Sequence, residues 1–288
     1  MAVLKLDRWN IAIGEGQPLV VIAGLNVLES EKLALDSAGH LKGVCAELGL
    51  PYIFKASFDK ANRSSIASYR GPGLEEGLRI LAKVKAEFEA PICTDLHTEN
   101  QAEAVAEVAD VVQIPAFLGR QTDLVVAAAR ATHRRGGWLH QKKSQNMAPW
   151  DAKHMVDKVR EAIGGAQISV LCERGTTFGY NNLVVDMLGI EEMHKLGVPV
   201  TIDATHAVQL PGADPRTQGA STGGRREGVP IIAKAAIAAG ADGVFLEFHP
   251  SPDDALCDGL SALPLAGARD LLATLKVLHE AVAPRRAA

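Results

Sequence analysis

Eight short apolar runs in the sequence each end in polar or charged side chains. In chain order these side chains are Asn26, Lys55, Asp95 with His97, Gln113, Lys142 with Gln145, Arg174, Asp203 with His206, and Glu247 with His249. Strands with a purely structural role could end in Gly, Asn or Ser. The accumulation of polar and charged side chains at these ends therefore indicates a functional site. Cations bind anionic oxygen atoms, and carboxylates and imidazoles transfer protons.

The segment KASFDKANRSS, residues 55–65, is especially rich in cations. Its candidates for binding an anion are Lys55, Ser57, Lys60, Asn62, Arg63 and Ser64. Later segments add Arg120, Lys142 and Arg174, which makes six cations in all. Arginine binds phosphate or carboxylate through two parallel hydrogen bonds, while lysine supplies a point charge. Because one phosphate needs fewer cations, the set predicts two phosphates, or a phosphate and a carboxylate, at one site.

His206, Glu247 and Asp258 form a second group of candidates. An imidazole with two carboxylates can hold a zinc ion or a harder cation. The same three groups can instead transfer protons or form hydrogen bonds without a metal. Their spacing in the sequence leaves both interpretations open.

The apolar runs that carry these residues alternate with stretches of helical periodicity. The runs cover residues 19–24, 52–57, 91–97, 111–116, 138–143, 168–174, 200–206 and 243–249. Strands that alternate with helices pair in parallel through helical crossovers. Eight such strands in roughly 250 residues favour a closed (β/α)8 TIM barrel, in which catalytic groups lie at the carboxyl ends of the strands.

The remaining segments agree with a barrel. Residues from about 3 to 16 show a period of two and predict an N-terminal β-hairpin that closes the bottom of the barrel. A doubly wound open sheet is the competing α/β fold, but no GxGxxG or P-loop motif follows any of the runs. No linker or low-complexity tract divides the chain, which predicts one catalytic domain over residues 1–288.

The composition favours a soluble enzyme that acts on small molecules. Hydrophobic residues make up 47% and charged residues 22% of the chain, and the net charge is -4. This balance offers no basic surface for nucleic acid, so local cations must bind any anion. No apolar run approaches the ~20 residues of a membrane span, and no secretory leader is visible. Four widely spaced cysteines without a CxxC pair predict free thiols in the cytoplasm.

Several motifs, from about Val20 to about Leu265, carry a resemblance to a known family. They are GLNVLES, KASFDKANRSSIASYRGPGLEEGL, PAFLGRQTDL, FGYNNLVVDML, STGGRR, HPSPDDALCDG and SALPL. This set resembles the 3-deoxy-D-manno-octulosonate 8-phosphate synthases, also called 2-dehydro-3-deoxyphosphooctonate aldolases. The resemblance implies a barrel transferase that condenses phosphoenolpyruvate with D-arabinose 5-phosphate and water. The products would be 3-deoxy-D-manno-octulosonate 8-phosphate and phosphate, on the route to the inner sugar of lipopolysaccharide.

The resemblance also implies roles for the residues named above. Phosphoenolpyruvate would be held by Lys55, Ser57, Lys142 and Arg174, and the pentose phosphate by Lys60, Asn62, Arg63 and Ser64. The reacting carbons would be lined by Asp95, Gln113, His206, Glu247 and Asp258. The expected catalytic residues are Asn26, Asp95, Lys142, His206 and Asp258, and Gln145 is a further substrate contact. Phe117 and Arg120 would reach a neighbouring site in a homotetramer.

One position of the family separates metal-dependent from metal-independent members. Metal-dependent members resemble a GPCxxES pattern, whose cysteine joins a histidine, a glutamate and an aspartate around the ion. This sequence reads GLNVLES, with Asn26 at the position of the cysteine. A neutral carboxamide is a poor replacement for a thiolate. The resemblance therefore implies a metal-independent enzyme without a cofactor.

Three alternatives remain open. A related synthase uses erythrose 4-phosphate, but that family typically shows a KPRT-like stretch where this chain reads KANRSS. A Schiff-base aldolase would use Lys55 or Lys142, whose pKa neighbouring cations could lower. A sugar-phosphate-binding regulator would bind both ligands without releasing phosphate.

The stretch KKSQN, residues 142–146, departs from the family's KKPQF-like stretch and leaves the geometry after Lys142 open.

Overall fold

The computed structural model describes residues 2–63, 65–214 and 222–282, and in it a ring of parallel strands closes into a barrel. The strands of the ring are β3 (Val20–Val27), β4 (Tyr52–Ser57), β5 (Ile92–Asp95), β6 (Val111–Ile114), β7 (Trp138–Lys142), β8 (Ser169–Glu173), β11 (Val200–Asp203) and β14 (Gly243–His249). They pair in this order, and β14 pairs with β3 to close the ring. The (β/α)8 barrel predicted from the alternating runs is confirmed.

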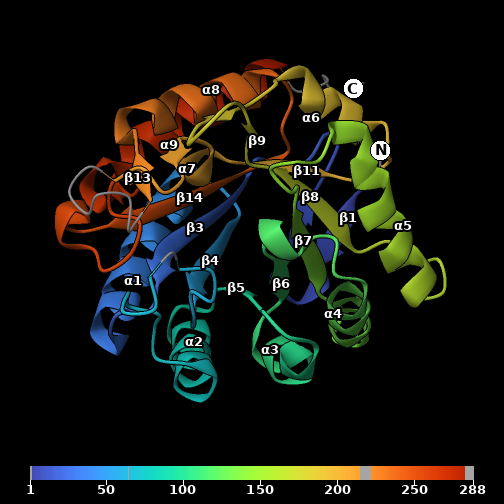
Figure 1. Cartoon of the computed structure of the whole chain (residues 1–288), viewed down its shortest axis with the longest axis horizontal. Helices are drawn as coiled ribbons and strands as arrows, with labels where there is room; N and C mark the ends of the chain where they lie inside the picture. Colours follow the sequence, from blue (N-terminus) through green and yellow to red (C-terminus); the bar gives the residue numbers. More distant parts are fainter. Residues whose placement is uncertain (1, 64, 215–221, 283–288) are drawn as a thin grey trace.

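Helices surround the ring of strands (Figure 1). They are α1 (Glu31–Leu48), α2 (Leu74–Phe88), α3 (Ala102–Val108), α4 (Thr122–Arg134), α5 (Lys153–Ala162), α6 (Leu188–His194), α7 (Ala204–Ala207), α8 (Val229–Ala238) and α9 (Ala268–Val282). Each long helix buries an apolar stripe against the strands, as α2 does with Leu78, Leu81 and Val84. None of the helices in the described ranges is long and apolar enough to cross a membrane.

The N-terminal hairpin consists of β1 (Leu4–Leu6) and β2 (Ile11–Ile13), which pair antiparallel. A single turn of 3-10 helix, η1 (Asp7–Trp9), connects the two strands. The apolar residues at alternate positions of the hairpin are buried against the lower interior of the barrel, where they pack with Trp138 and Phe245. The period of two in the sequence thus has a physical cause, and the predicted hairpin at the bottom of the barrel is confirmed.

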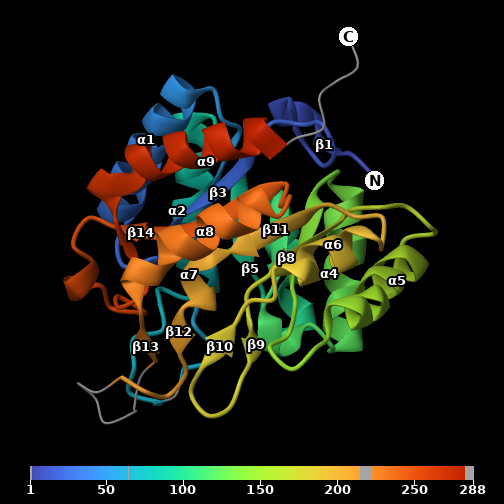
Figure 2. The same cartoon turned by 90° about the horizontal axis from the view of Figure 1, so that it is seen from above.

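The opposite end of the barrel carries short additional strands (Figure 2). They are β9 (Thr176–Thr177) with β10 (Leu183–Val184), β12 (Gln209–Leu210) with β13 (Gly223–Gly224), and β15 (Leu263–Pro264) beside β14. Further single turns of 3-10 helix are η2 (Glu99–Gln101), η3 (Ala116–Leu118), η4 (Pro149–Ala152), η6 (Arg226–Gly228), η7 (Pro252–Asp254) and η8 (Leu265–Gly267). Several of these pieces extend the walls around the carboxyl ends of the barrel strands.

Candidate active site

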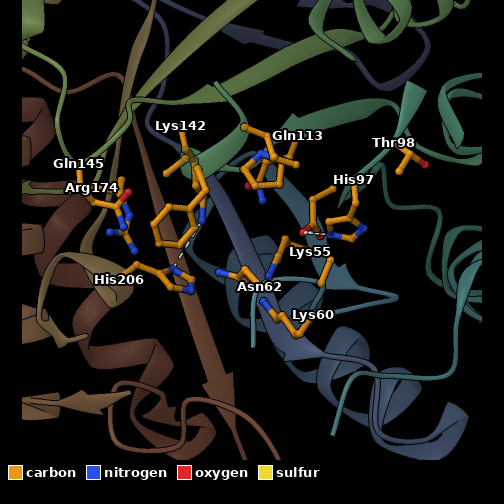
Figure 3. Close-up of a pocket in the computed structure, with 16 residues that line it drawn as sticks. Lys55, Lys60, Asn62, His97, Thr98, Gln113, Lys142, Gln145, Arg174 and His206 are labelled. Carbon is orange, nitrogen blue, oxygen red and sulfur yellow. Dashed lines mark hydrogen bonds and ion pairs between the residues drawn. The ribbon is translucent and has the colours of Figure 1, made fainter. Parts of the chain in front are cut away.

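The carboxyl ends of the strands enclose two adjoining cavities of about 280 and 160 Å³. Both are lined by Lys60, Asn62, Phe117, Gln145, Arg174 and His206. The larger cavity also contacts Lys55, Asp95, His97, Thr98, Gln113 and Lys142. The smaller one also contacts Arg63, Gln209, Cys257 and Asp258. Figure 3 shows the labelled side chains converging on the larger cavity from several strands, so the structure brings together most of the residues predicted from the strand ends.

Lys55 is buried at the end of β4, close to the backbone of β3. The backbones approach closely at Gly24, where a Cβ atom would lie 2.0 Å from the carbonyl oxygen of Lys55. Lys55 Nζ lies 2.6 Å from Glu247 Oε1 and donates to the carbonyl of Asn26 at 3.0 Å. Burial lowers the pKa of Lys55, although the charge of Glu247 opposes this shift.

Asp203, at the end of β11, holds two candidate catalytic side chains. Its Oδ2 lies 2.6 Å from Lys142 Nζ and 2.8 Å from His206 Nδ1. Its Oδ1 accepts from the backbone N–H of His206 at 2.9 Å, which caps α7 and fixes the direction of the imidazole. Burial opposes the charge of Asp203, but His206 and Lys142 outweigh it and hold the pKa of this carboxyl well below its usual range.

Asn26, Glu247 and Asp258 meet next to the Nε2 atom of His206, on the side of the ring away from Asp203. Asn26 Nδ2 donates to Glu247 Oε2 at 2.5 Å and to Asp258 Oδ2 at 3.4 Å. His206 Nε2 lies 3.5 Å from Glu247 Oε2 and 4.0 Å from Asp258 Oδ2. Burial lowers the pKa of His206, although the carboxylates of Asp203 and Glu247 oppose this shift. Within the described ranges, no group of three or more His, Cys, Asp or Glu side chains is arranged to hold a metal ion.

Arg174 and Lys60 keep cationic donors available for an anion. Arg174 is buried and donates from Nη2 to Gln209 Oε1 at 3.0 Å. Its Nε and Nη1 atoms have no hydrogen-bond partner among the described residues. Burial opposes the charge of Lys60, but Glu247 and Asp95 outweigh it and raise the pKa of Lys60. Since a buried charged donor needs an acceptor, Arg174 is a candidate for binding an anionic oxygen atom, and the half-buried Lys60 lines the same two cavities.

Asp95, Gln113 and Ser57 lie at the ends of the neighbouring strands β5, β6 and β4. Asp95 Oδ2 lies 3.1 Å from His97 Nε2. Burial opposes the charge of Asp95, but His97 and Lys60 outweigh it and hold the pKa of this carboxyl below its usual range. Gln113 is buried beside the cavity, and the Ser57 hydroxyl is buried without a hydrogen-bond partner among the described residues.

Arg63 lies at the smaller cavity, in the loop after β4. Its Nη1 atom donates to Cys257 Sγ at 2.7 Å and lies 3.6 Å from Asp258 Oδ1. Its Nε atom is buried and has no hydrogen-bond partner in the part of the chain that the structure describes. Ser64, the next predicted contact, lies outside the described residues.

Phe117 and Arg120 differ from the other predicted residues because they are expected to reach the site of a neighbouring subunit. Phe117 belongs to η3, is 64% exposed and lines both cavities of its own chain. Arg120 is exposed and contacts neither cavity of its own chain. Its role at a neighbouring site therefore stays a prediction.

Several residues of the site, among them Thr98 at the larger cavity, received no role from the sequence. Asp203 and His97 stand at strand ends, which is the signal that could have assigned them. Gln209 follows His206 by three positions and contacts both Arg174 and Asp258. Cys257 contacts Arg63 across 194 positions of the chain, a separation at which no local pattern gives a signal.

This combination of a closed barrel with cations and carboxylates at its mouth defines a class of enzymes for anionic substrates. The model of the DAHP synthetase I family matches residues 2–283, so the chain belongs to this family. The 2-dehydro-3-deoxyphosphooctonate aldolase of Alkalilimnicola ehrlichii is 52% identical over 280 residues, which are 97% of this chain and 98% of the relative. That of Thiobacillus denitrificans is 54% identical over 272 residues, 94% of each chain. Within the family, the chain therefore belongs to the 2-dehydro-3-deoxyphosphooctonate aldolases, which confirms the resemblance of its motifs.

Proposed function

We propose that this protein is a transferase that condenses phosphoenolpyruvate with D-arabinose 5-phosphate and water. The products are 3-deoxy-D-manno-octulosonate 8-phosphate and inorganic phosphate, for the inner core of lipopolysaccharide. The observation that carries the proposal is the position of Arg174, two of whose donors have no partner in the described ranges, in the same cavity as Lys142 and His206. The name of the relatives, 2-dehydro-3-deoxyphosphooctonate aldolase, supports the identity of the sugar acid.

Phosphoenolpyruvate binds, in this proposal, to the larger cavity. Arg174, Lys142, Lys55 and Ser57 hold its phosphate and carboxylate. The two nitrogens of Arg174 that lack a partner among the described residues suit bidentate binding to a phosphate, and the buried hydroxyl of Ser57 suits a single oxygen atom. Lys55 and Lys142 are each held by a carboxylate at 2.6 Å, so their ammonium groups are oriented before the substrate arrives.

The pentose phosphate binds through the loop after β4. Lys60 and Asn62 contact both cavities, so they can bridge the two substrates. Arg63, with Ser64 as the predicted neighbour, holds the phosphate of the pentose at the smaller cavity, and Gln145 contacts the sugar from the opposite wall. The cations offset the repulsion between two anionic substrates and allow them to approach.

The chemistry joins C3 of phosphoenolpyruvate to the aldehyde carbon of the open-chain pentose. Water adds at C2, where positive charge develops, and loses a proton to a group at the cavity, which returns a proton to the new alkoxide. The pair of Asp203 and His206, with Lys142, is placed to move this proton, while Asp95, Asn26 and Asp258 position the reacting atoms. The tetrahedral intermediate then loses phosphate by cleavage of its C–O bond, and the cations stabilise the departing anion.

We further propose that the reaction needs no metal ion. The side chain of Asn26 presents an N–H donor, not a lone pair, to Glu247 and Asp258. Glu247 also accepts from Lys55. Because these contacts occupy the oxygen atoms that would coordinate a cation, the donor set does not fit a metal ion.

The proposal includes a homo-oligomer, a tetramer by resemblance, in the cytoplasm. The exposed ring of Phe117 at the mouth and the exposed Arg120 nearby support a neighbouring subunit that completes the site. The four cysteines are free and buried, as expected for a reducing compartment. Sedimentation of the purified protein with and without Phe117→Ala tests the subunit contact.

The experiment that tests the function is release of inorganic phosphate from phosphoenolpyruvate. Release that requires arabinose 5-phosphate, with mass-spectrometric detection of the eight-carbon product, supports the proposal. Preference for erythrose 4-phosphate would favour the related synthase instead. Trapping of substrate on Lys55 or Lys142 by borohydride would favour a Schiff-base aldolase, and binding of both ligands without release would favour a regulator.

A further inference from the structure

His140 is a buried titratable residue to which the proposed chemistry gives no role. It lies in the middle of β7, one inward-facing position below Lys142, and is 0% exposed. Its Nδ1 atom lies 3.2 Å from Gln113 Oε1, and its Nε2 atom lies 2.9 Å from Thr201 Oγ1. The ring stacks on Phe245, with ring centres 6.0 Å apart and an interplanar angle of 11°. His140 therefore connects the interior of the barrel to Gln113 at the cavity wall.

The imidazole of His140 is neutral at physiological pH. Burial, with a further effect of the Lys142 charge, lowers its pKa to about 3. A neutral imidazole carries one N–H, so one nitrogen donates and the other accepts. The identity of the donating nitrogen consequently decides which end of the Gln113 amide contacts the ring.

The contacts of Gln113 and Thr201 together indicate which nitrogen donates. Gln113 Oε1, a carbonyl oxygen that only accepts, lies next to Nδ1. The other nitrogen, Nε2, faces Thr201. Its hydroxyl has one hydrogen and two possible acceptors, His140 Nε2 at 2.9 Å and the Leu171 carbonyl oxygen at 3.2 Å. Donation to the nearer Nε2 leaves the hydrogen of the ring on Nδ1, where it donates to Gln113 Oε1. This assignment pairs a donor with an acceptor at both ring nitrogens, and the Thr201 hydroxyl then no longer donates to the Leu171 carbonyl. The amide nitrogen of Gln113 then faces the cavity that Gln113 lines (Figure 3).

We propose that His140 is a positioning residue that turns the N–H donors of Gln113 toward the oxygen atoms of phosphoenolpyruvate. The inference rests on the proposed function, which places phosphoenolpyruvate between Lys55 and Lys142 in the same cavity. An anionic substrate requires donors at that wall, whereas the opposite amide orientation would direct a carbonyl oxygen at the anion. With the hydrogen of His140 on Nδ1, that orientation would set an N–H of Gln113 against the N–H of the ring.

Two substitutions separate this role from a general packing role. His140→Leu fills the space but offers no donor. His140→Asn places an amide nitrogen one bond from Cγ, where Nδ1 lies, and can restore the donation to Gln113. We expect His140→Leu to raise the dissociation constant for phosphoenolpyruvate, measured by calorimetry without the pentose, about tenfold or more. We expect His140→Asn to stay within about threefold of the wild type. Thermal unfolding of both variants verifies that they fold.

A spectroscopic measurement tests the orientation independently of substrate. In the ring ¹⁵N spectrum of histidine-labelled protein, the signals absent from His140→Asn belong to His140. We expect them to report an Nδ1–H tautomer that does not change between about pH 5 and 9. An Nε2–H tautomer would overturn the proposal, as would equal loss of affinity in the two variants or none in His140→Leu. Failure of the wild type to bind phosphoenolpyruvate would instead refute the proposed function, because the tautomer is measured without it.

Discussion

Lys142 Nζ and Asp203 Oδ2 lie 2.6 Å apart, although their strands β7 and β11 are separated by β8. The same oxygen atom accepts from His206 Nδ1 at 2.8 Å. One buried carboxylate therefore fixes the ammonium group of Lys142 and assigns the hydrogen of His206 to Nδ1. The Nε2 atom of His206 is then left to exchange a proton at the cavity.

The first prediction concerns this carboxylate. Asp203→Asn keeps the shape of the side chain but removes the charge that holds Lys142 and His206. We expect kcat to fall at least about 100-fold, since a positioned acid or base typically contributes that much. A matched control is Asp242→Asn, because Asp242 holds His194 at 2.9 Å outside both cavities. The control should keep kcat within about threefold of wild type, and an Asp203→Asn enzyme of near-normal kcat would remove the pair from the mechanism.

The second prediction concerns the binding of the pentose phosphate. Arg63→Ala removes the guanidinium from the smaller cavity and should raise the KM for arabinose 5-phosphate. Loss of a charge-assisted hydrogen bond costs on the order of 1.5–3 kcal/mol, which corresponds to roughly 10- to 150-fold. Arg130→Ala, on the exposed side of α4, serves as the control for loss of a surface arginine. If the KM for phosphoenolpyruvate rose instead, the loop after β4 would be assigned to the wrong substrate.

The third prediction is the effect of His140 on stability as the pH falls. The pKa of His140 is about 3 in the folded chain, compared with the ordinary value of 6.5 that we take for the unfolded chain. Below about pH 6.5 the unfolded chain binds a proton that the folded chain does not, so His140 reduces stability as the pH falls. We therefore expect the wild type to lose about 2 kcal/mol more than His140→Asn between pH 7 and 5. Denaturant unfolding of both proteins at the two pH values measures this difference, and equal losses would mean that His140 is protonated in the folded chain.

The sequence was sufficient to predict the elements whose pattern arises from local burial. Strands such as β3 and β4 are buried along their whole length, which produces the continuous apolar runs. The hairpin of β1 and β2 buries alternate residues, which produces its period of two. Because parallel strands present their carboxyl ends at one side of the barrel, the polar residues that follow them could also be predicted to meet.

Other features depend on contacts that no local pattern records. Strands of two residues, such as Thr176–Thr177, are too short to show a period. The contact of Arg63 with Cys257 joins segments at opposite ends of the sequence. His140 stands in WLHQKK, where its neighbours give no sign that the side chain is enclosed by the barrel. These features follow from the closure of the ring, not from the residues next to them.

The fourth prediction concerns chelation. The amide of Asn26 donates to Glu247 and Asp258, and Glu247 also binds Lys55, so the cluster is held together by hydrogen bonds and charge. We therefore expect full activity after exhaustive treatment with a strong chelator, and no stoichiometric metal in the purified protein by elemental analysis. Loss of activity on chelation, followed by recovery with a divalent metal, would contradict a metal-independent reaction.

The last prediction is that Asn26→Cys creates a metal site. The substitution removes the N–H donor that faces Glu247 and Asp258 and adds a thiolate, the ligand that zinc and similar ions prefer. With His206 Nε2 already 3.5 Å from Glu247 and 4.0 Å from Asp258, a thiolate would bring the set to four ligands. We expect about one zinc or cadmium ion per chain by equilibrium dialysis. Asn26→Ser, which has no thiolate, is the control and should bind none. Absence of metal from the cysteine variant would show that the cluster cannot rearrange around an ion, and binding by the serine variant would show that the thiolate is not what selects it.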